Sequence, residues 1–307
     1  MGLHQFFNIL YRKFLSEKTK EIGEQAILWI ALASFIIHLI VIELVSFGVI
    51  HITEPSNLLK NPIAAIYTPF SFILVYEVYL LIYYLPKSTS TYISKQYEII
   101  TLIIIRRLFK DLSGLSLSTN WFNINDDLQF TYDLLASVIL FYLIYQFHRH
   151  RMKKYRTANP HKANLSSVSK FINAKKIIAT ALVPILFVTA IYSFVSWSMS
   201  VIYPDFTNGI SFKNINNVFF EQFFNILIIA DVILLLFSFF HTDEFHKVIR
   251  NSGFIISTIL IRLSFSVSGI VNVVVIVSAT LFGLLIIIIH NKFESQLAME
   301  SKTKEEL

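Results

Sequence analysis

The 307-residue sequence contains no cysteine, which excludes structural disulfides, thiolate metal sites and a cysteine nucleophile. Charged residues are scarce: they make up 15% of the chain, compared with about 25% in soluble domains. The sequence also lacks glycine-rich phosphate loops, the metalloprotease pattern and the serine-hydrolase elbow. An enzyme is therefore not indicated, and no cofactor is expected.

Apolar residues dominate the composition. They account for 55% of the chain, including 29 Phe, and the mean hydropathy is +0.61. They gather into runs of roughly 20 residues, the length that crosses a hydrocarbon core of about 30 Å as a helix. The runs predict an all-α integral membrane protein with eight transmembrane helices. The predicted spans are 27–50, 62–85, 95–113, 130–147, 177–203, 217–240, 250–267 and 270–289.

The distribution of basic residues predicts the orientation. The termini and the even-numbered loops contain 20 of the 26 Lys and Arg residues. Because cationic loops stay on the cytoplasmic side of a membrane, both termini are expected in the cytoplasm. The first 25 residues combine apolar positions at helical spacing with four basic residues. The segment 1–25 is therefore predicted to be an amphipathic helix on the membrane surface.

The longest hydrophilic stretch, 148–176, divides the chain near its middle and contains nine basic residues. One interpretation is a cytoplasmic linker that binds anionic lipid headgroups or an acidic partner. The other is a loop whose charge only sets the topology. Nucleic-acid binding is not expected, because no nucleic-acid-binding motif accompanies the charge.

The chain carries an internal repeat. Residues 99–106 align without gaps on residues 255–262 and match at five of eight positions, including the final arginine. The repeat predicts two four-helix units, 26–147 and 177–290, followed by a cytoplasmic tail, 291–307. Since each unit has an even number of spans, the two copies are expected to be parallel repeats related by an axis along the membrane normal.

Each predicted unit has one carboxylate in its second span and one arginine in its third: Glu77 with Arg106, and Asp231 with Arg262. The helical rise of about 1.5 Å per residue puts all four residues roughly 13–18 Å from the cytoplasmic ends of their spans. An ionised group at the bilayer centre costs at least about 2.5–3.5 kcal/mol, so the opposite charges are expected to pair. The pairs either line a pathway for an anion or a proton, or fasten the helices in register.

Four further polar residues are candidates. The cations Lys95 and Arg250 precede the two arginines and are expected at the cytoplasmic mouth of each unit. His38 and Glu43, in the first span, mark either a site that only the first unit uses or an interhelical hydrogen bond. No metal ligands are expected, because no predicted helix carries a histidine and a carboxylate four residues apart.

An acid in the second span, a cation at the start of the third and an arginine about 30 residues after the acid form an ordered pattern. This pattern resembles the phosphate-starvation-inducible E (PsiE) family of bacterial membrane proteins. The matching positions are Glu77, Lys95, Arg106 and Asp111 in the first unit, and Asp231, Arg250 and Arg262 in the second. The second copy has Asp in place of Glu and no acid five residues after its arginine. The resemblance implies a four-helix unit in the bacterial inner membrane, present here twice.

Two functions follow as hypotheses. The first is passage of a small ion, an anion such as phosphate or a proton, along the paired charges. The second is a non-transporting scaffold or accessory subunit, acting as a homo-oligomer or within a larger membrane complex.

Overall fold

The computed structural model describes residues 3–49, 62–112, 125–152, 165–202, 215–240, 244–267 and 269–305. These residues form helices and short turns with no β-strand among them, so the predicted all-α fold is confirmed for the described chain. The helices are α1 (Leu3–Phe14), α2 (Glu17–Ser46), the 3-10 helix η2 (Pro62–Ile66), α3 (Tyr67–Tyr84), α4 (Thr89–Leu112), α5 (Asn125–Arg151), α6 (Leu165–Ile202), α7 (Ile215–Phe239), α8 (Phe245–Ser264) and α9 (Ile270–Glu305).

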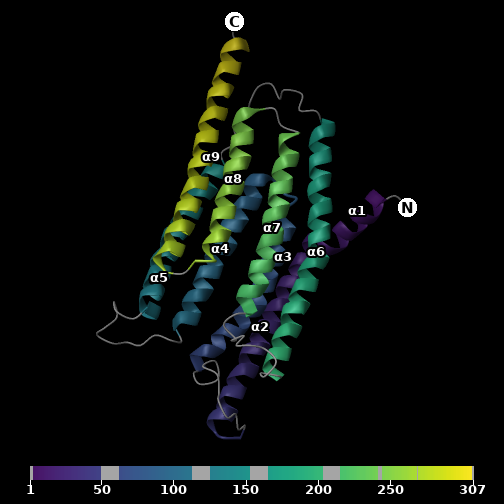
Figure 1. Cartoon of the computed structure of the whole chain (residues 1–307). Helices are drawn as coiled ribbons and strands as arrows, with labels where there is room; N and C mark the ends of the chain where they lie inside the picture. Colours follow the sequence, from purple (N-terminus) through teal and green to yellow (C-terminus); the bar gives the residue numbers. More distant parts are fainter. Residues whose placement is uncertain are drawn as a thin grey trace.

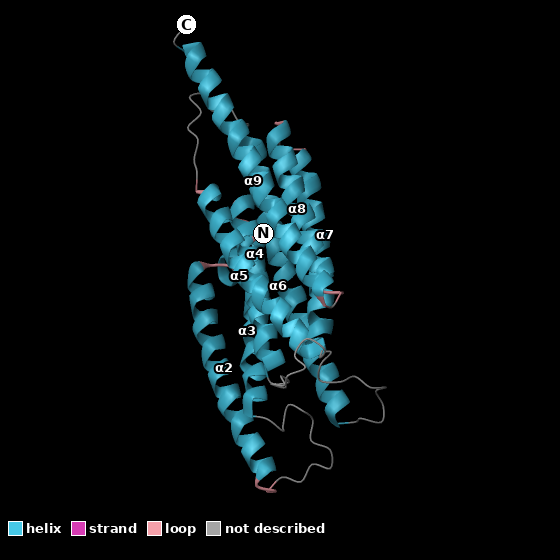
Figure 2. Ribbon diagram, turned by 90° about the vertical axis from the view of Figure 1, so that its left-hand side faces the viewer, coloured by secondary structure: helices cyan, strands magenta, loops and turns pink. Residues whose placement is uncertain are grey.

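The long helices alternate in direction along the bundle (Figure 1). Each helix packs against the next one within the group α2 to α5, and again within the group α6 to α9. The two groups meet where α5 packs against α9, α4 against α8, and α3 against α6. The third and fourth helices of each group therefore supply much of the contact between the groups, and α2 lies at the edge of the bundle (Figure 2).

Among the described residues, four helices are long and apolar enough to cross a membrane, which indicates a membrane protein: Glu17–Ser46, Leu128–Arg151, Ser169–Tyr192 and Ile270–Glu300. Two shorter helical segments, Thr68–Tyr84 and Phe223–Phe239, are also apolar. The remaining two long helices, α4 and α8, contain the charged residues discussed below, which lower their hydropathy. Large apolar side chains such as Trp29 and Phe141 are 72% and 74% exposed, as expected for surfaces that face lipid.

The N-terminal amphipathic helix is shorter than the predicted segment 1–25. α1 ends at Phe14, and the Ser16 hydroxyl caps α2 by accepting a hydrogen bond from the backbone N–H of Thr19 at 3.1 Å. α2 then begins at Glu17, ten residues before the predicted span. α1 packs against α6, and the Lys176 ammonium lies 5.4 Å from the centre of the Tyr11 ring. Contacts with α6 therefore hold α1 in place.

Helices also extend into the predicted linker and tail. α5 continues to Arg151 and α6 begins at Leu165, so both ends of the segment 148–176 are helical, while its residues 153–164 lie outside the described residues. α9 continues to Glu305 through the predicted tail 291–307 and extends beyond the neighbouring helices (Figure 1). The predicted boundaries followed the apolar runs. A helix can continue beyond such a run, because its backbone hydrogen bonds do not require apolar side chains.

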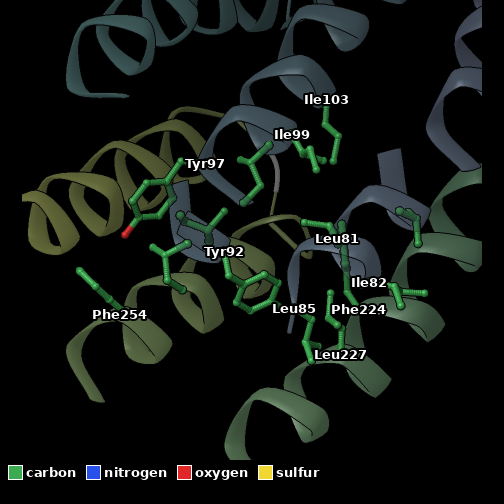
Figure 3. Close-up of a cluster of buried hydrophobic side chains, with 14 of the residues drawn as sticks. Leu81, Ile82, Leu85, Tyr92, Tyr97, Ile99, Ile103, Phe224, Leu227 and Phe254 are labelled. Atoms are coloured by element: carbon green, nitrogen blue, oxygen red, sulfur yellow. The ribbon is translucent and has the colours of Figure 1, made fainter. Parts of the chain in front are cut away.

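The core forms where the two groups meet. Figure 3 shows side chains of α3 and α4, among them Leu81 and Tyr97, converging with Phe224 of α7 and Phe254 of α8. The ring of Phe147, on α5, lies 5.1 Å from that of Tyr97 and 5.6 Å from that of Phe254. These centroid distances are within the range of favourable aromatic pairs, so aromatic contacts join helices of both groups.

Gly283 leaves room for the Tyr97 side chain of α4 against α9, and its replacement by alanine should destabilise the protein by about 1–3 kcal/mol through overpacking. A Cβ atom at Gly283 would lie 1.8 Å from the Tyr97 hydroxyl oxygen and 3.1 Å from the Ser257 hydroxyl oxygen. Unfolding in detergent measures the change. Gly23→Ala is the matched control, because its Cβ would lie 3.6 Å from the nearest atom of Tyr76; that variant should be neutral or about 0.5–1 kcal/mol more stable. Equal effects at the two glycines would contradict the prediction.

Candidate functional site

Asp231 and Arg262 form an ion pair between α7 and α8. The Arg262 Nη1 atom lies 2.9 Å from the Asp231 Oδ2 atom, and the two residues are 5% and 1% exposed. Two residues of α4 complete the arrangement: the Tyr92 hydroxyl donates to Asp231 Oδ1 at 2.9 Å, and Arg262 Nη2 donates to Gln96 Oε1 at 3.0 Å. The pair therefore joins the second group of helices to the first.

Glu77 and Arg106 form the corresponding contact between α3 and α4. The Arg106 Nη1 atom lies 3.6 Å from the Glu77 Oε2 atom and donates a hydrogen bond to the Phe70 carbonyl oxygen at 3.3 Å. Both charged residues are buried, at 7% and 6% exposed. The structure thus brings both predicted pairs into contact. The charged atoms of Glu77 and Arg106 are farther apart than those of the second pair, and the hydrogen bond from Arg106 to Phe70 stays within the first group of helices.

The two cations expected at the cytoplasmic mouths have different surroundings. The Lys95 ammonium lies 2.6 Å from Glu98 Oε2, one turn further along α4. Arg250 instead donates to His290 Nε2, on α9, at 2.9 Å. The two residues therefore occupy similar places near the start of α4 and α8 but make unlike contacts. Asp111, the acid that follows Arg106 in the family pattern, is the penultimate residue of α4.

His38 and Glu43 both lie on α2 but have separate surroundings. The His38 Nδ1 atom hydrogen-bonds to the Thr68 hydroxyl on α3, which agrees with the interhelical hydrogen bond considered above. Glu43 lies five residues further along the helix and is exposed.

A third charged cluster, which the sequence analysis did not single out, joins α4, α5 and α9. Arg107 donates from Nε and Nη2 to the two carboxylate oxygens of Asp133, and Nη2 also donates to Asn272 Oδ1 at 2.8 Å. Gln129 donates to Asp133 Oδ1 at 2.9 Å. The Asp133 side chain is fully buried. The sequence did contain a signal for this cluster. Asp133 lies inside the predicted span 130–147, and Arg107, in the preceding predicted span, was a candidate partner for it.

A pocket lies between α4, α6, α7 and α8, and Asp231 forms part of its wall. Lys175 also lines this pocket. It is 5% exposed and donates from Nζ to the Lys87 carbonyl oxygen at 3.2 Å. Ser238 and Asn251 contribute further polar side chains to the wall. The pocket therefore holds a buried cation and a buried carboxylate near the ends of four helices. Lys175 was counted with the linker, and its burial could not be inferred from its position beside the predicted span 177–203.

Candidate metal ligands lie at the end of the bundle where α8 begins. His246, His290 and Glu294 each bring a ligand atom to within 4.8 Å of the others. His290 and Glu294 are four residues apart on α9, so the stated reason for expecting no metal ligands does not hold. The predicted last span ended at residue 289, which left this spacing outside every predicted helix.

The described residues thus define a helical membrane protein in which buried ion pairs join neighbouring helices. Comparison with protein-family models, with curated proteins and with solved structures finds no match to the chain.

Proposed function

We propose that the chain is an eight-span protein of the bacterial inner membrane, built from two PsiE-like four-helix repeats with both termini in the cytoplasm. The positions of the buried charges support the repeat. Arg106 and Arg262 each occupy the eighteenth position of their helices, while Glu77 and Asp231 lie seven and eight residues before the ends of α3 and α7. Each group also packs through consecutive helices in the same order, as a duplicated unit requires.

The proposed activity is passage of a small ion, an anion or a proton, through the pocket beside Asp231. One observation carries this proposal: Lys175 and Asp231 line the same pocket, and Asp231 is paired with Arg262. Ionisable groups inside a membrane commonly mark ion pathways and proton relays. Asp231 lies eight residues before the end of α7, which corresponds to a depth of about 12 Å. The wall of the pocket therefore contains two buried ionisable groups, Lys175 and Asp231.

The chemistry of these groups suggests how an ion would move. The Lys175 ammonium and the Arg262 guanidinium provide positive charge that attracts an anion. Asp231 can accept a proton, and the Tyr92 hydroxyl beside it, at 2.9 Å, offers a second group for proton transfer. In this proposal the contact between Asp231 and Arg262 opens transiently, because Asp231 lines the pocket and is held by Arg262.

The alternative is a non-transporting scaffold or accessory subunit of a larger membrane complex, or a homo-oligomer. The extension of α9 favours it, because the end of this helix passes beyond the neighbouring helices and offers a surface to a partner (Figure 1). In this role the ion pairs only hold the helices in register. The basic segment 148–176 would then contact anionic lipid headgroups or the partner.

Flux measurements in liposomes distinguish the two functions. The doubly substituted variant Asp231→Asn/Arg262→Gln and the single variant Lys175→Gln should each lower the flux of protons, chloride or phosphate by more than about tenfold, a barrier increase of about 1.4 kcal/mol. The reason is that both changes remove charge from the pocket. The readouts are a pH-sensitive dye and anion electrodes.

The matched control is Glu77→Gln/Arg106→Gln, which removes an ion pair that the pocket does not include. Flux in this control should stay within about twofold of the unmodified protein, a barrier change of about 0.4 kcal/mol. A folded protein that carries none of the tested ions above the rate of protein-free liposomes would favour the scaffold.

A further inference from the structure

Two histidines and a glutamate converge where α8 begins, outside the pocket beside Asp231. His246 lies in the first turn of α8, and His290 and Glu294 lie one turn apart on α9. The His246 Nε2 atom is 3.0 Å from Glu294 Oε1, and the His290 Nε2 atom is 3.8 Å from the same oxygen. The two imidazole rings are stacked, with centroids 5.3 Å apart. Both rings therefore direct Nε2 toward one carboxylate.

These separations match a metal-binding geometry. Zn²⁺ binds imidazole nitrogen and carboxylate oxygen at about 2.0–2.2 Å, and tetrahedral ligands at that distance are about 3.4 Å from one another. The measured separations of 3.0 and 3.8 Å lie on either side of this value. Two imidazoles and a carboxylate also form a ligand set that zinc uses in proteins. The ligand nitrogens of His246 and His290 lie within 4.8 Å of each other, so side-chain rotation has to complete the arrangement of the three ligand atoms around one ion.

Arg250 holds His290 in the form that a metal requires. Its Nη1 atom lies 2.9 Å from His290 Nε2, and because a guanidinium only donates hydrogen bonds, Nε2 must accept. A metal ligand likewise needs an unprotonated ring nitrogen. The Nε and Nη2 atoms of Arg250 donate to Asn251 Oδ1 at 3.2 and 3.0 Å. Because the guanidinium is a rigid planar group, binding of a metal at Nε2 requires the whole group to move away from His290.

Two carboxylates and two cations surround the histidines. Glu244 Oε2 lies 3.4 Å from His246 Nε2, so a second carboxylate is available beside Glu294. Glu244 is half exposed and His246 is 10% exposed in its side chain, which leaves one side of the cluster open for entry of the ion. The two carboxylates are balanced by Arg250 and by Lys247, whose Nζ atom lies 2.8 Å from Glu244 Oε1, so the case for an ion rests on the ligand atoms and not on an excess of negative charge.

We propose that His246, His290 and Glu294 bind Zn²⁺, with Glu244 or a water molecule as the fourth ligand. The ion links the first turn of α8 to α9 at the point where α9 continues toward its exposed end. Binding replaces the hydrogen bond from Arg250 to His290, so the arginine and the metal compete for one nitrogen. This site is independent of the proposed ion passage, because none of its three ligands lines the pocket.

The test is zinc binding by the full chain, purified in detergent with a histidine-free tag. Zinc is counted by mass spectrometry after gel filtration, and the affinity is measured by competition with a chromophoric chelator. We expect one ion per chain. Glu294→Gln and His246→Gln should each weaken zinc binding by at least about tenfold. Removing a residue that only supports a metal ligand already costs about tenfold in affinity, so loss of a ligand should cost at least as much. The control Glu300→Gln changes an exposed glutamate on the same helix and should leave binding unchanged.

Arg250→Gln provides a test in the opposite direction. Removing the competing cation should tighten zinc binding by about tenfold or more, a result that damage to the fold would not produce. Co²⁺ substitution should give the absorption spectrum of a tetrahedral site in the unmodified protein and lose it in Glu294→Gln. Absence of zinc from the unmodified chain would overturn the proposal, as would binding that neither Glu294→Gln nor His246→Gln alters.

Discussion

Asp231→Asn should destabilise the protein by about 3–5 kcal/mol, because it leaves the Arg262 guanidinium buried without its negative partner. Arg262 is 5% exposed, so water cannot take the place of the lost carboxylate. The asparagine keeps an oxygen that can accept the hydrogen bond of the Tyr92 hydroxyl, which limits the change to the lost charge. The measurement is unfolding of the purified protein in mixed detergent micelles.

The double variant Asp231→Asn/Arg262→Met should recover much of this loss, because it removes both charges from the protein interior together. Replacing a whole buried ion pair is often nearly neutral. A double-mutant cycle then gives the coupling between the two residues. The same cycle at Glu77 and Arg106 is the matched comparison. Its coupling should be smaller, because the charged atoms are 3.6 Å apart instead of 2.9 Å. Couplings of equal size would contradict the order that these distances predict.

The pairing of the charges could be predicted from the sequence because helical geometry is regular. Each helix rises by a constant amount per residue, so spacing along the chain gave the depths of Glu77, Arg106, Asp231 and Arg262. The high energy of a lone charge in lipid then required a partner at similar depth. The same reasoning could not supply Tyr92 or the other α4 contact of the second pair. These contacts depend on how two groups of helices pack together, which no spacing within one helix determines.

Helix boundaries were less predictable than helix positions. Hydropathy marks where a chain meets lipid, and helices continue past that point when nothing in the sequence stops them. α4 begins at Thr89, six residues before the predicted span, and α9 ends at Glu305, sixteen residues after its predicted span. The proposed metal ligands were missed for this reason, because His290 and Glu294 lie in the part of α9 that extends past the predicted span. A search for this spacing along the whole sequence would have found it.

Asp133 lies inside the predicted span 130–147, and the sequence analysis did not single it out. In the structure its side chain is fully buried, and α9 supplies Asn272 to the same cluster. Arginine binding a carboxylate through two parallel N–H bonds is among the stronger charged interactions in proteins. The cluster therefore holds α4, α5 and α9 together at the interface between the two groups.

Arg107→Met should accordingly destabilise the protein by about 3 kcal/mol, the lower end of the range for a broken buried pair. The lower end applies because the Arg107 side chain is 23% exposed and Gln129 remains to donate to Asp133. Unfolding in mixed micelles gives the value. Arg149→Met is the matched control, since Arg149 is exposed on α5 and should change stability by no more than about 0.5 kcal/mol.

The double variant Arg107→Met/Asp133→Asn separates a charge effect from a loss of packing. Asparagine keeps an acceptor for Gln129 and removes the negative charge that Arg107 neutralised, so stability should return toward that of the unmodified protein. If the double variant is less stable than Arg107→Met alone, the methylene groups and hydrogen bonds of the arginine, not its charge, stabilise the contact between α4 and α5. A loss in Arg149→Met equal to that in Arg107→Met would show that burial of Asp133 is not the cause.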